Sequence, residues 1–306
     1  MKSLGRVVGK VKRVEFCGRD WVVVVDGAGK VWRGSFEKVL GEGDGEGGGV
    51  WVKAEGELRG RSVEKVGCSL DHCVAVTRDG YAAGWGKNVY GKVGEALAVG
   101  DVEEPVVIGK ELGVRFTSVA VGKNHTLLVD SDGGVWGCGD DFWGQLGRTR
   151  EPWKDSKGAE RSKTLGRAEM IKGLPIVDAR AGEGHSVLRV RDGGVVTMGF
   201  NQWSQCGQSN FATIARPARI GSIDRVRAIA AGNLHTCVVD ENGDTRCCGG
   251  NEFGQLGNGT LQPSTNFKKV KGLGKVKRQN RKITALFLGN DASGVVITPP
   301  EAPSDP

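Results

Sequence analysis

All four histidines of this chain occupy the same place in a recurring motif. His72, His125, His185 and His235 each follow a short turn and precede an apolar run. Histidine is the usual general base near neutral pH, so these residues could signal proton-transfer chemistry. Repetition argues against that interpretation, because four equivalent positions cannot all present one active site. We therefore expect each histidine to hydrogen-bond the backbone within its own repeat and to act as a determinant of the fold.

A second polar position recurs at a fixed distance from the histidines. Asn88, Asp141, Asn201 and Asn251 each lie 16 residues after one of them, in glycine-rich turns. Side chains of this type can satisfy the backbone groups of a turn. No Ser-His-Asp order, P-loop, dinucleotide fingerprint or paired-carboxylate motif stands out in the sequence. We predict structural repeat markers without catalytic residues, no cofactor, and a protein that is not an enzyme of covalent chemistry.

The histidines and the Asn or Asp markers are expected to lie in or next to short strands. Each histidine precedes an apolar run that ends in an Asp-Gly or Asn-Gly doublet, which tolerates the positive φ of a tight hairpin. Runs before the histidine and after the hairpin, and a further stretch that begins with proline in two repeats, supply the other strands. Two degenerate rows carry Trp21 and Ala292 at the histidine position, so the six markers are separated by 51, 53, 60, 50 and 57 residues. Such a period in a strand-rich chain is typical of propeller blades.

The sequence thus predicts an all-β chain in which residues 1–298 form a single β-propeller of four-stranded antiparallel blades. Six blades fit the six markers; the alternative is seven, with an unrecognised blade around residues 37–62. The strand from Arg6 to Val14 is expected to close the ring by joining the blade begun by residues 283–297, which would protect open edges. The proline-rich residues 299–306 are expected to be a disordered tail.

The composite motif resembles a known family. It reads V-x-x-x-x-x-G-x-x-H-T, then D-G, then W/G-x-G-x-N-x-x-G-Q-L-G, most clearly in residues 116–147 and 226–260. It is similar to the regulator-of-chromosome-condensation repeat, whose members are β-propellers, and the likeness covers residues 7–297. The resemblance implies the fold and leaves the function open, because one fold hosts many functions.

The resemblance implies several roles. We favour a non-catalytic interaction scaffold or adaptor. One alternative is a guanine-nucleotide exchange factor for a small Ran-type GTPase, which would bind the nucleotide-free GTPase most tightly; this chain is shorter than those members and has no basic tail before the propeller. Another is an α-tubulin-suppressor-like cofactor in tRNA wobble-uridine modification and diphthamide synthesis, which segments such as CGRDWVVVVDGAGKVW resemble. The turns before the histidines lack the tryptophans of ultraviolet-B photoreceptors, so that role is not expected.

Partner-binding residues are expected where the repeats differ. An insertion from Arg148 to Lys172 is basic and carries a tryptophan, a composition typical of interface hot spots. The stretch from Lys268 to Lys282 has eight basic residues and no acid, and could contact phosphate or direct nuclear import. A solvated loop is the alternative for both stretches. The candidate partner-binding residues are Arg148, Arg150, Trp153, Lys154, Lys275, Lys277, Arg278 and Arg281.

The net charge of +7 favours a protein partner such as a small GTPase or an acidic protein. Direct nucleic-acid binding is less favoured, because aromatic residues do not alternate with the basic ones. No run of eighteen apolar residues occurs, so we expect no membrane association, a monomeric propeller, and a cytoplasmic or nuclear location. The basic start of the chain leaves a mitochondrial presequence as the less favoured alternative.

The eight cysteines do not predict a disulfide framework. Four of them lie in or beside apolar strand runs, namely Cys17, Cys68, Cys73 and Cys237. A free thiol behaves there as a small hydrophobic group, which favours a reducing compartment. A metal site that combines Cys68 and Cys73 with the Cys247-Cys248 pair is not expected, because no C-x-x-C motif occurs and the nearby histidines are repeat elements.

Overall fold

The computed structural model describes residues 10–18, 21–35, 51–94, 100–148, 161–167, 174–273, 282–288 and 293–298. Within these residues the regular structure is β-strand, apart from three short 3₁₀ helices, η1 (Gly56–Leu58), η2 (Val89–Gly91) and η3 (Lys110–Leu112). No helix in this part of the chain is long and apolar enough to cross a membrane. The chain divides into two compact units: unit 1 is Met1–Asp140 with Glu151–Arg167, and unit 2 is Asp141–Arg150 with Ala168–Pro306.

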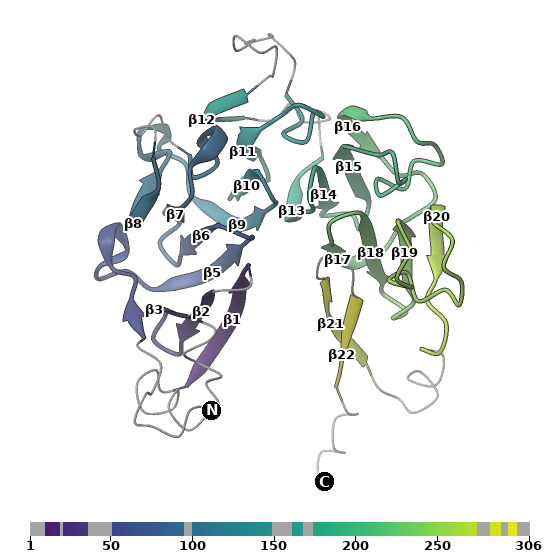
Figure 1. The fold of residues 1–306 in the computed structure, drawn as a ribbon, viewed down its shortest axis with the longest axis horizontal. Helices are drawn as coiled ribbons and strands as arrows, with labels where there is room; N and C mark the ends of the chain where they lie inside the picture. Colours follow the sequence, from purple (N-terminus) through teal and green to yellow (C-terminus); the bar gives the residue numbers. More distant parts are fainter. Residues whose placement is uncertain are drawn as a thin grey trace, which may run out of the picture. The chain divides into compact units, whose positions relative to one another are not determined.

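Unit 1 contains three four-stranded antiparallel sheets, seen in purple to teal in Figure 1. Sheet 1 consists of β1 (Val11–Cys17), β2 (Trp21–Asp26), β3 (Val31–Ser35) and β4 (Val52–Lys53). Sheet 2 consists of β5 (Val63–Cys68), β6 (His72–Thr77), β7 (Ala82–Gly86) and β8 (Val102–Ile108). Sheet 3 consists of β9 (Phe116–Val121), β10 (His125–Asp130), β11 (Val135–Asp140) and β12 (Arg161–Arg167).

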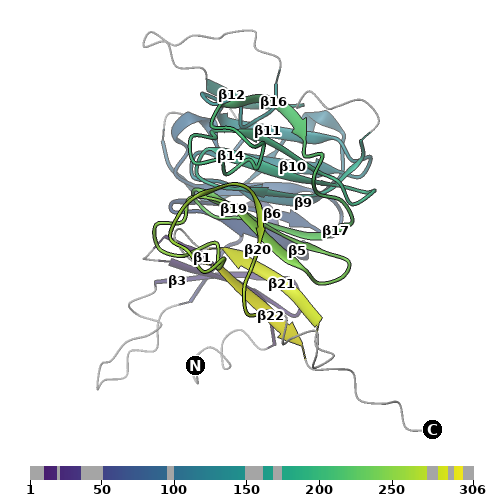
Figure 2. The same cartoon turned by 90° about the vertical axis from the view of Figure 1, so that its right-hand side faces the viewer.

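Unit 2 repeats the same strand order along the chain, as Figure 1 shows in green, and Figure 2 shows its last two strands, β21 and β22, side by side in yellow. Sheet 4 consists of β13 (Ile176–Ala181), β14 (His185–Val190), β15 (Val195–Gly199) and β16 (Ile214–Arg219). Sheet 5 consists of β17 (Val226–Ala231), β18 (His235–Asp240), β19 (Thr245–Gly249) and β20 (Ser264–Lys269). A last pair, β21 (Lys282–Leu288) and β22 (Ser293–Thr298), forms a two-stranded sheet in the described residues. The predicted all-β architecture of four-stranded antiparallel sheets is confirmed.

The core of each unit lies between consecutive sheets. The second strands of sheets 1, 2, 3 and 5 are buried along almost their whole length, which explains the unbroken apolar runs there. In unit 1, Val25 of sheet 1 packs with Val63 and Ala75 of sheet 2. In unit 2, Val187 of sheet 4 packs with Val238 of sheet 5. The repeats therefore bury their apolar faces against neighbouring repeats.

Two predictions about strand assignment need revision. Residues 11–14, which were expected to join the blade of residues 283–297, belong to β1, the first strand of sheet 1, which pairs with β2. Part of the segment 37–62, the alternative seventh blade, supplies β4 of sheet 1. The tail 299–306 lies outside the described residues, and the single-domain organisation stays a prediction.

Candidate functional site

Each of the four histidines is the first residue of a second strand, and each is buried. Steric crowding explains why a glycine lies three residues before the histidine. A Cβ at Gly182 would lie 2.3 Å from Cε1 of His185, so only glycine leaves room for the imidazole at that position. In sheet 2 a serine replaces this glycine, and Ser69 Oγ lies 2.8 Å from Nδ1 of His72.

The Nε2 atoms of three histidines contact a hydroxyl of the following sheet. His72 lies 3.2 Å from Thr126 Oγ1, His185 lies 2.9 Å from Thr236 Oγ1, and His235 lies 2.9 Å from Ser293 Oγ. Each hydroxyl donates its proton to a backbone carbonyl of the preceding repeat, those of Lys92, Gln205 and Gln255, all at 2.7 Å. The single proton of the hydroxyl is used in the bond to the carbonyl, so the hydroxyl oxygen must accept the bond from the histidine. Nε2 therefore carries the proton of the bond between histidine and hydroxyl. We call these contacts the histidine junctions.

The histidine junctions correct the prediction that these side chains bond the backbone of their own repeat. Nε2 instead bonds the next sheet, because the imidazole at the strand start reaches the neighbouring hydroxyl across the sheet interface. Burial lowers the pKa of His72 to about 4, with a further contribution from the charge of Lys92, while Asp71 acts in the opposite direction. Burial also lowers the pKa of His125 to about 3. A neutral, enclosed imidazole holds sheets together and offers no access to a substrate.

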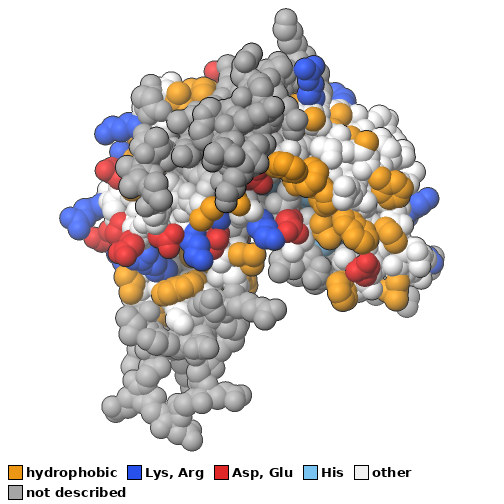
Figure 3. All heavy atoms as spheres, turned by 45° about the horizontal axis from the view of Figure 1, so that its top comes forward, with side chains coloured by type: hydrophobic (Ala, Val, Ile, Leu, Met, Phe, Trp, Pro, Cys, Tyr) orange, Lys and Arg blue, Asp and Glu red, His pale blue; other side chains and the backbone are white. Residues whose placement is uncertain are grey.

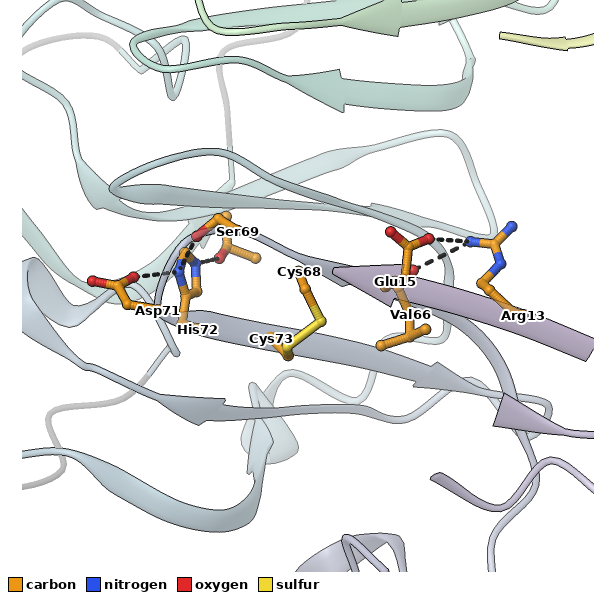
Figure 4. The surroundings of a disulfide bond; sticks show 9 residues. Arg13, Glu15, Val66, Cys68, Ser69, Asp71, His72 and Cys73 are labelled. Carbon is orange, nitrogen blue, oxygen red and sulfur yellow. Dashed lines mark hydrogen bonds and ion pairs between the residues drawn. A yellow bond between two sulfur atoms is a disulfide. The ribbon is translucent and has the colours of Figure 1, made fainter. Parts of the chain in front are cut away.

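Sheet 2 adds a charged pair to its junction. Lys92 is only 1% exposed, and its Nζ lies 2.7 Å from Oδ1 of Asp71, which also lies 3.4 Å from Nδ1 of His72. Figure 4 shows Ser69 and Asp71 on either side of His72, with a disulfide on the adjacent part of the hairpin. Burial acts to raise the pKa of Asp71, but the pKa falls to about 2, to which the hydrogen bond from Lys92 and its positive charge contribute.

The residues at the second marker position close the turn that follows each third strand. Oδ1 of Asn88, Asp141, Asn201 and Asn251 accepts a hydrogen bond from the backbone N–H five residues later, at 2.8 to 3.1 Å. In three of these turns the side-chain oxygen of a glutamine accepts a hydrogen bond from the backbone N–H of an aromatic residue. The bonds run from Trp143 N to Gln145 Oε1, from Trp203 N to Gln205 Oε1 and from Phe253 N to Gln255 Oε1. We call residues 141–146, 201–206 and 251–256 of unit 2 the aromatic turns.

The aromatic turns expose large apolar side chains. Phe142 is 47% exposed and Phe253 is 70% exposed. Trp143 packs edge-on against Phe142, with ring centroids 4.6 Å apart, and lies 4.8 Å from the ring of Phe200. Figure 3 shows hydrophobic side chains gathered over this unit with few charged ones between them. The polar groups below fix the turns, so the rings stand on a rigid base.

Sequence reasoning did not select these aromatic residues. The signal was present, since an aromatic residue occurs two positions after the Asn or Asp marker in four turns, as Tyr90, Trp143, Trp203 and Phe253. Of the predicted partner-binding residues, Arg148 follows the first aromatic turn and its side chain is half-buried. The other seven, Arg150, Trp153, Lys154, Lys275, Lys277, Arg278 and Arg281, lie outside the described residues.

The cysteine prediction was wrong for four side chains. Cys68 is bonded to Cys73 and Cys237 to Cys247, each with a Cα–Cα distance of 4.1 Å. Each pair lies directly opposite across neighbouring antiparallel strands, a register that the cysteine positions in the sequence do not reveal. The inference of a reducing compartment therefore loses its basis. Among the described residues no group of three or more His, Cys, Asp or Glu side chains could hold a metal.

Two family models, both described as regulator of chromosome condensation (RCC1) repeat, match the chain. One matches residues 63–92, 116–145 and 226–255, and the other matches residues 79–129 and 192–239. Human E3 ubiquitin-protein ligase HERC2 is 29% identical over 237 residues, which are 76% of this chain and 5% of HERC2. Xenopus laevis serine/threonine-protein kinase Nek9 is also 29% identical, over 71% of this chain and 24% of Nek9. The chain thus spans a small part of these relatives.

Solved structures share the fold. Human WBSCR16 superimposes with a TM-score of 0.77 at 20% identity, covering 95% of this chain and 73% of that one. Prp20p from Saccharomyces cerevisiae gives a TM-score of 0.59 at 17% identity, covering 98% and 85%. Four-stranded sheets repeated along the chain, with a buried histidine at the start of the second strand in sheets 2 to 5, define a β-propeller-type repeat protein. The matched segments are RCC1 repeats, as the sequence motif predicted.

Proposed function

We propose that this chain is a non-catalytic scaffold or adaptor that binds a protein partner through the aromatic turns. The observation that carries the proposal is the exposure of Phe142 and Phe253 on turns that are fixed by buried hydrogen bonds. Large aromatic side chains supply most of the affinity in many interfaces, and clustered exposed apolar groups often mark such surfaces. A fixed turn also loses less conformational entropy when a partner binds.

The structural neighbours support a protein partner. Prp20p binds Gsp1p and histones, and in another structure it is bound by Kap60. For this chain we propose the binding of a protein, with a cytoplasmic or nuclear location. Nucleotide exchange on a small Ran-type GTPase and an α-tubulin-suppressor-like role are the alternatives. The net charge of +7 is compatible with an acidic partner.

Affinity enrichment with quantitative mass spectrometry tests the role of the aromatic turns. A triple variant, Phe142→Ala, Trp143→Ala and Phe253→Ala, should lose the proteins that the wild type enriches. Phe16→Ala in β1 is the matched control, because that ring is 60% exposed and lies in unit 1. Equal enrichment by the wild type and the triple variant would overturn the proposal.

An exchange assay separates the scaffold from its main alternative. Release of labelled GDP from a Ran-type GTPase is followed with the chain at substoichiometric concentration. The proposal expects the release rate to stay at its intrinsic value. Catalysed release would identify an exchange factor, and the triple variant would then show whether the aromatic turns contact the GTPase.

A further inference from the structure

A hollow of about 570 Å³ lies in unit 1, away from the aromatic turns. Two short segments form it, the connection from η1 to β5 and the tip of the hairpin between β6 and β7. The hairpin tip lies at the end of β6 opposite to His72, so the hollow is separate from the histidine junctions. Its lining residues are Arg59, Gly60, Arg61, Ser62, Arg78 and Asp79. We call it the arginine hollow.

Backbone and side-chain contacts hold the walls of the arginine hollow in place. The N–H of Arg78 donates to the carbonyl of Ser62 at 2.8 Å, which ties one wall to the other. The guanidinium of Arg61 pairs with Asp79 and lies 3.8 Å above the ring centroid of Tyr81. An arginine held by an ion pair and an aromatic face is already positioned before a ligand arrives.

The charge of the lining is positive. It contains three arginines and one aspartate, and that aspartate is engaged by Arg61. The other two guanidinium groups extend into solvent, with side chains 79% exposed for Arg59 and 74% exposed for Arg78. Each is paired with a glutamate outside the lining, Arg59 with Glu55 at 2.9 Å and Arg78 with Glu64 at 3.8 Å. Each of these glutamates is also paired with a lysine, Lys53 or Lys12, so the whole group of side chains keeps more cations than carboxylates. An anion in the hollow would therefore meet more positive than negative charge.

The backbone leaves space for a ligand. Gly60 has a φ of +77°, and no atom lies within 4 Å of the position that its Cβ would occupy. A planar guanidinium presents a fork of N–H donors that fits the oxygens of a phosphate or carboxylate. Three such groups around one space can satisfy a dianion with three terminal oxygens better than a single carboxylate, because each oxygen can find its own donor pair.

We propose that the arginine hollow binds a phosphate monoester carried by a protein partner, such as a phosphoserine or phosphothreonine side chain. Arg61 supplies the fixed donor fork, and Arg59 and Arg78 close on the phosphate from the two walls. Recognition of phosphorylated segments by arginine clusters is a recurring mode of peptide binding. The site does not depend on the aromatic turns, which lie in the other unit.

Nuclear magnetic resonance titration of the full chain tests the assignment with four probes: inorganic phosphate, a phosphoserine peptide of otherwise neutral residues, its serine counterpart and its glutamate counterpart. The phosphoserine peptide should shift the amide signals of Gly60 and Ser62 and bind at least about tenfold more tightly than the serine peptide. Equal binding of the glutamate peptide would overturn phosphate selectivity. Equal binding of inorganic phosphate would assign the hollow to a free ion and overturn the protein-borne source.

Variants test the residues. Arg59→Ala with Arg78→Ala should weaken phosphopeptide binding roughly tenfold or more, and Arg61→Lys should weaken it although the charge is kept, because lysine lacks the donor fork. The matched control, Arg216→Ala with Arg225→Ala, removes the same charge from exposed sites in unit 2. Thermal denaturation checks that every variant is folded. Unchanged binding by the Arg59/Arg78 variant, or an equal loss in the control, would refute the proposal.

Discussion

The interface between sheets 1 and 2 differs from the histidine junctions in the chemistry that joins the sheets. At that interface Trp21 replaces the histidine and is 49% exposed, and Cys73 replaces the hydroxyl residue. Cys73 is bonded to Cys68 within its own sheet, so the side-chain link of the histidine junctions is missing. Apolar packing around Val25 and Val63 remains, together with an ion pair from Lys12 to Glu64 at 3.0 Å. Two hydrogen bonds also join these sheets, from Arg13 Nη1 to the carbonyl of Val66 at 3.2 Å and from the N–H of Val63 to the carbonyl of Gly29 at 2.8 Å.

The difference separates two contributions to the fold. Burial of apolar strand faces joins these sheets, and where the histidine is absent it acts together with the ion pair and hydrogen bonds of other residues. The histidine junction adds a directional hydrogen bond between the first residue of one strand and a hydroxyl of the next sheet. This bond also gives the buried Nε2 atom a hydrogen-bond partner. We therefore expect the histidine junctions to be more sensitive to pH and to single substitutions than the first interface.

Acid should produce the largest effect. The pKa of His72 is about 4 and that of His125 about 3 in the folded chain, below the usual value of 6.5, so the unfolded state binds protons first as the pH falls. The stabilisation is complete above about pH 6.5 and is lost toward pH 4, by up to about 1.4 kcal/mol per pH unit for each such histidine. Denaturant titrations at pH 7, 6 and 5 measure this slope.

A glutamine substitution tests the origin of that slope. His72→Gln should flatten the pH dependence by the share of one histidine, whereas Trp21→Gln should leave it unchanged. An unaltered slope in the His72 variant would show that other groups cause the acid sensitivity.

Removal of one histidine side chain should have the next largest effect. His185→Ala leaves a cavity and removes the partner of Thr236, so we expect a loss of about 2 to 3 kcal/mol in the free energy of unfolding. Trp21→Ala at the first interface should cost about 1 kcal/mol or less, because half of that side chain is in solvent. Urea denaturation compares the two variants, and equal losses would contradict the distinction between the interfaces.

The disulfide of sheet 2 should contribute about 2 kcal/mol. It closes a short loop, since Cys68 and Cys73 are separated by 5 positions, and the entropy gained from so short a loop is modest. The test uses a background in which the Cys237–Cys247 bond has been removed by substitution. In this background Cys68→Ser with Cys73→Ser should lower the denaturation midpoint. The midpoint should equal that of the unsubstituted background treated with a dithiol reductant. A midpoint unaffected by either treatment would contradict the assigned bond.

The charged pair of sheet 2 should give the smallest effect. Asp71→Asn leaves Lys92 buried without its carboxylate and should cost about 1 to 2 kcal/mol, less than for a fully enclosed pair because Asp71 is partly exposed. Lys92→Gln introduces the residue found in the other repeats, so the double variant should recover most of the loss. A double-mutant cycle measures the coupling, and strictly additive losses would show that the pair is not coupled.

The sequence predicted the strands, the hairpins and the repeat because these depend on neighbouring residues. The order of glycine or serine, histidine, apolar run and Asp-Gly or Asn-Gly doublet recurs in four repeats and can be recognised without tertiary information. The partners of the histidines were missed because they lie far along the chain: Thr126 is 54 residues from His72, and Thr236 is 51 residues from His185. Lys92 can be recognised in the sequence as the exception at a repeat position that is glutamine in other repeats. Its partner Asp71 is identified only in the folded chain, where the two turns lie side by side.

The candidate sites divide in the same way. Aromatic residues at one position of successive turns could have been recognised from the sequence, whereas the arginine hollow joins residues 59–62 with residues 78 and 79, which only the folded hairpins bring together. Repeated four-stranded units of the RCC1 type can be predicted from the sequence, because local turn chemistry and strand periodicity specify them. Which sheet each histidine joins, which cysteines pair and where charges converge depend on strand register and on packing between repeats, so these features emerge only in the folded chain.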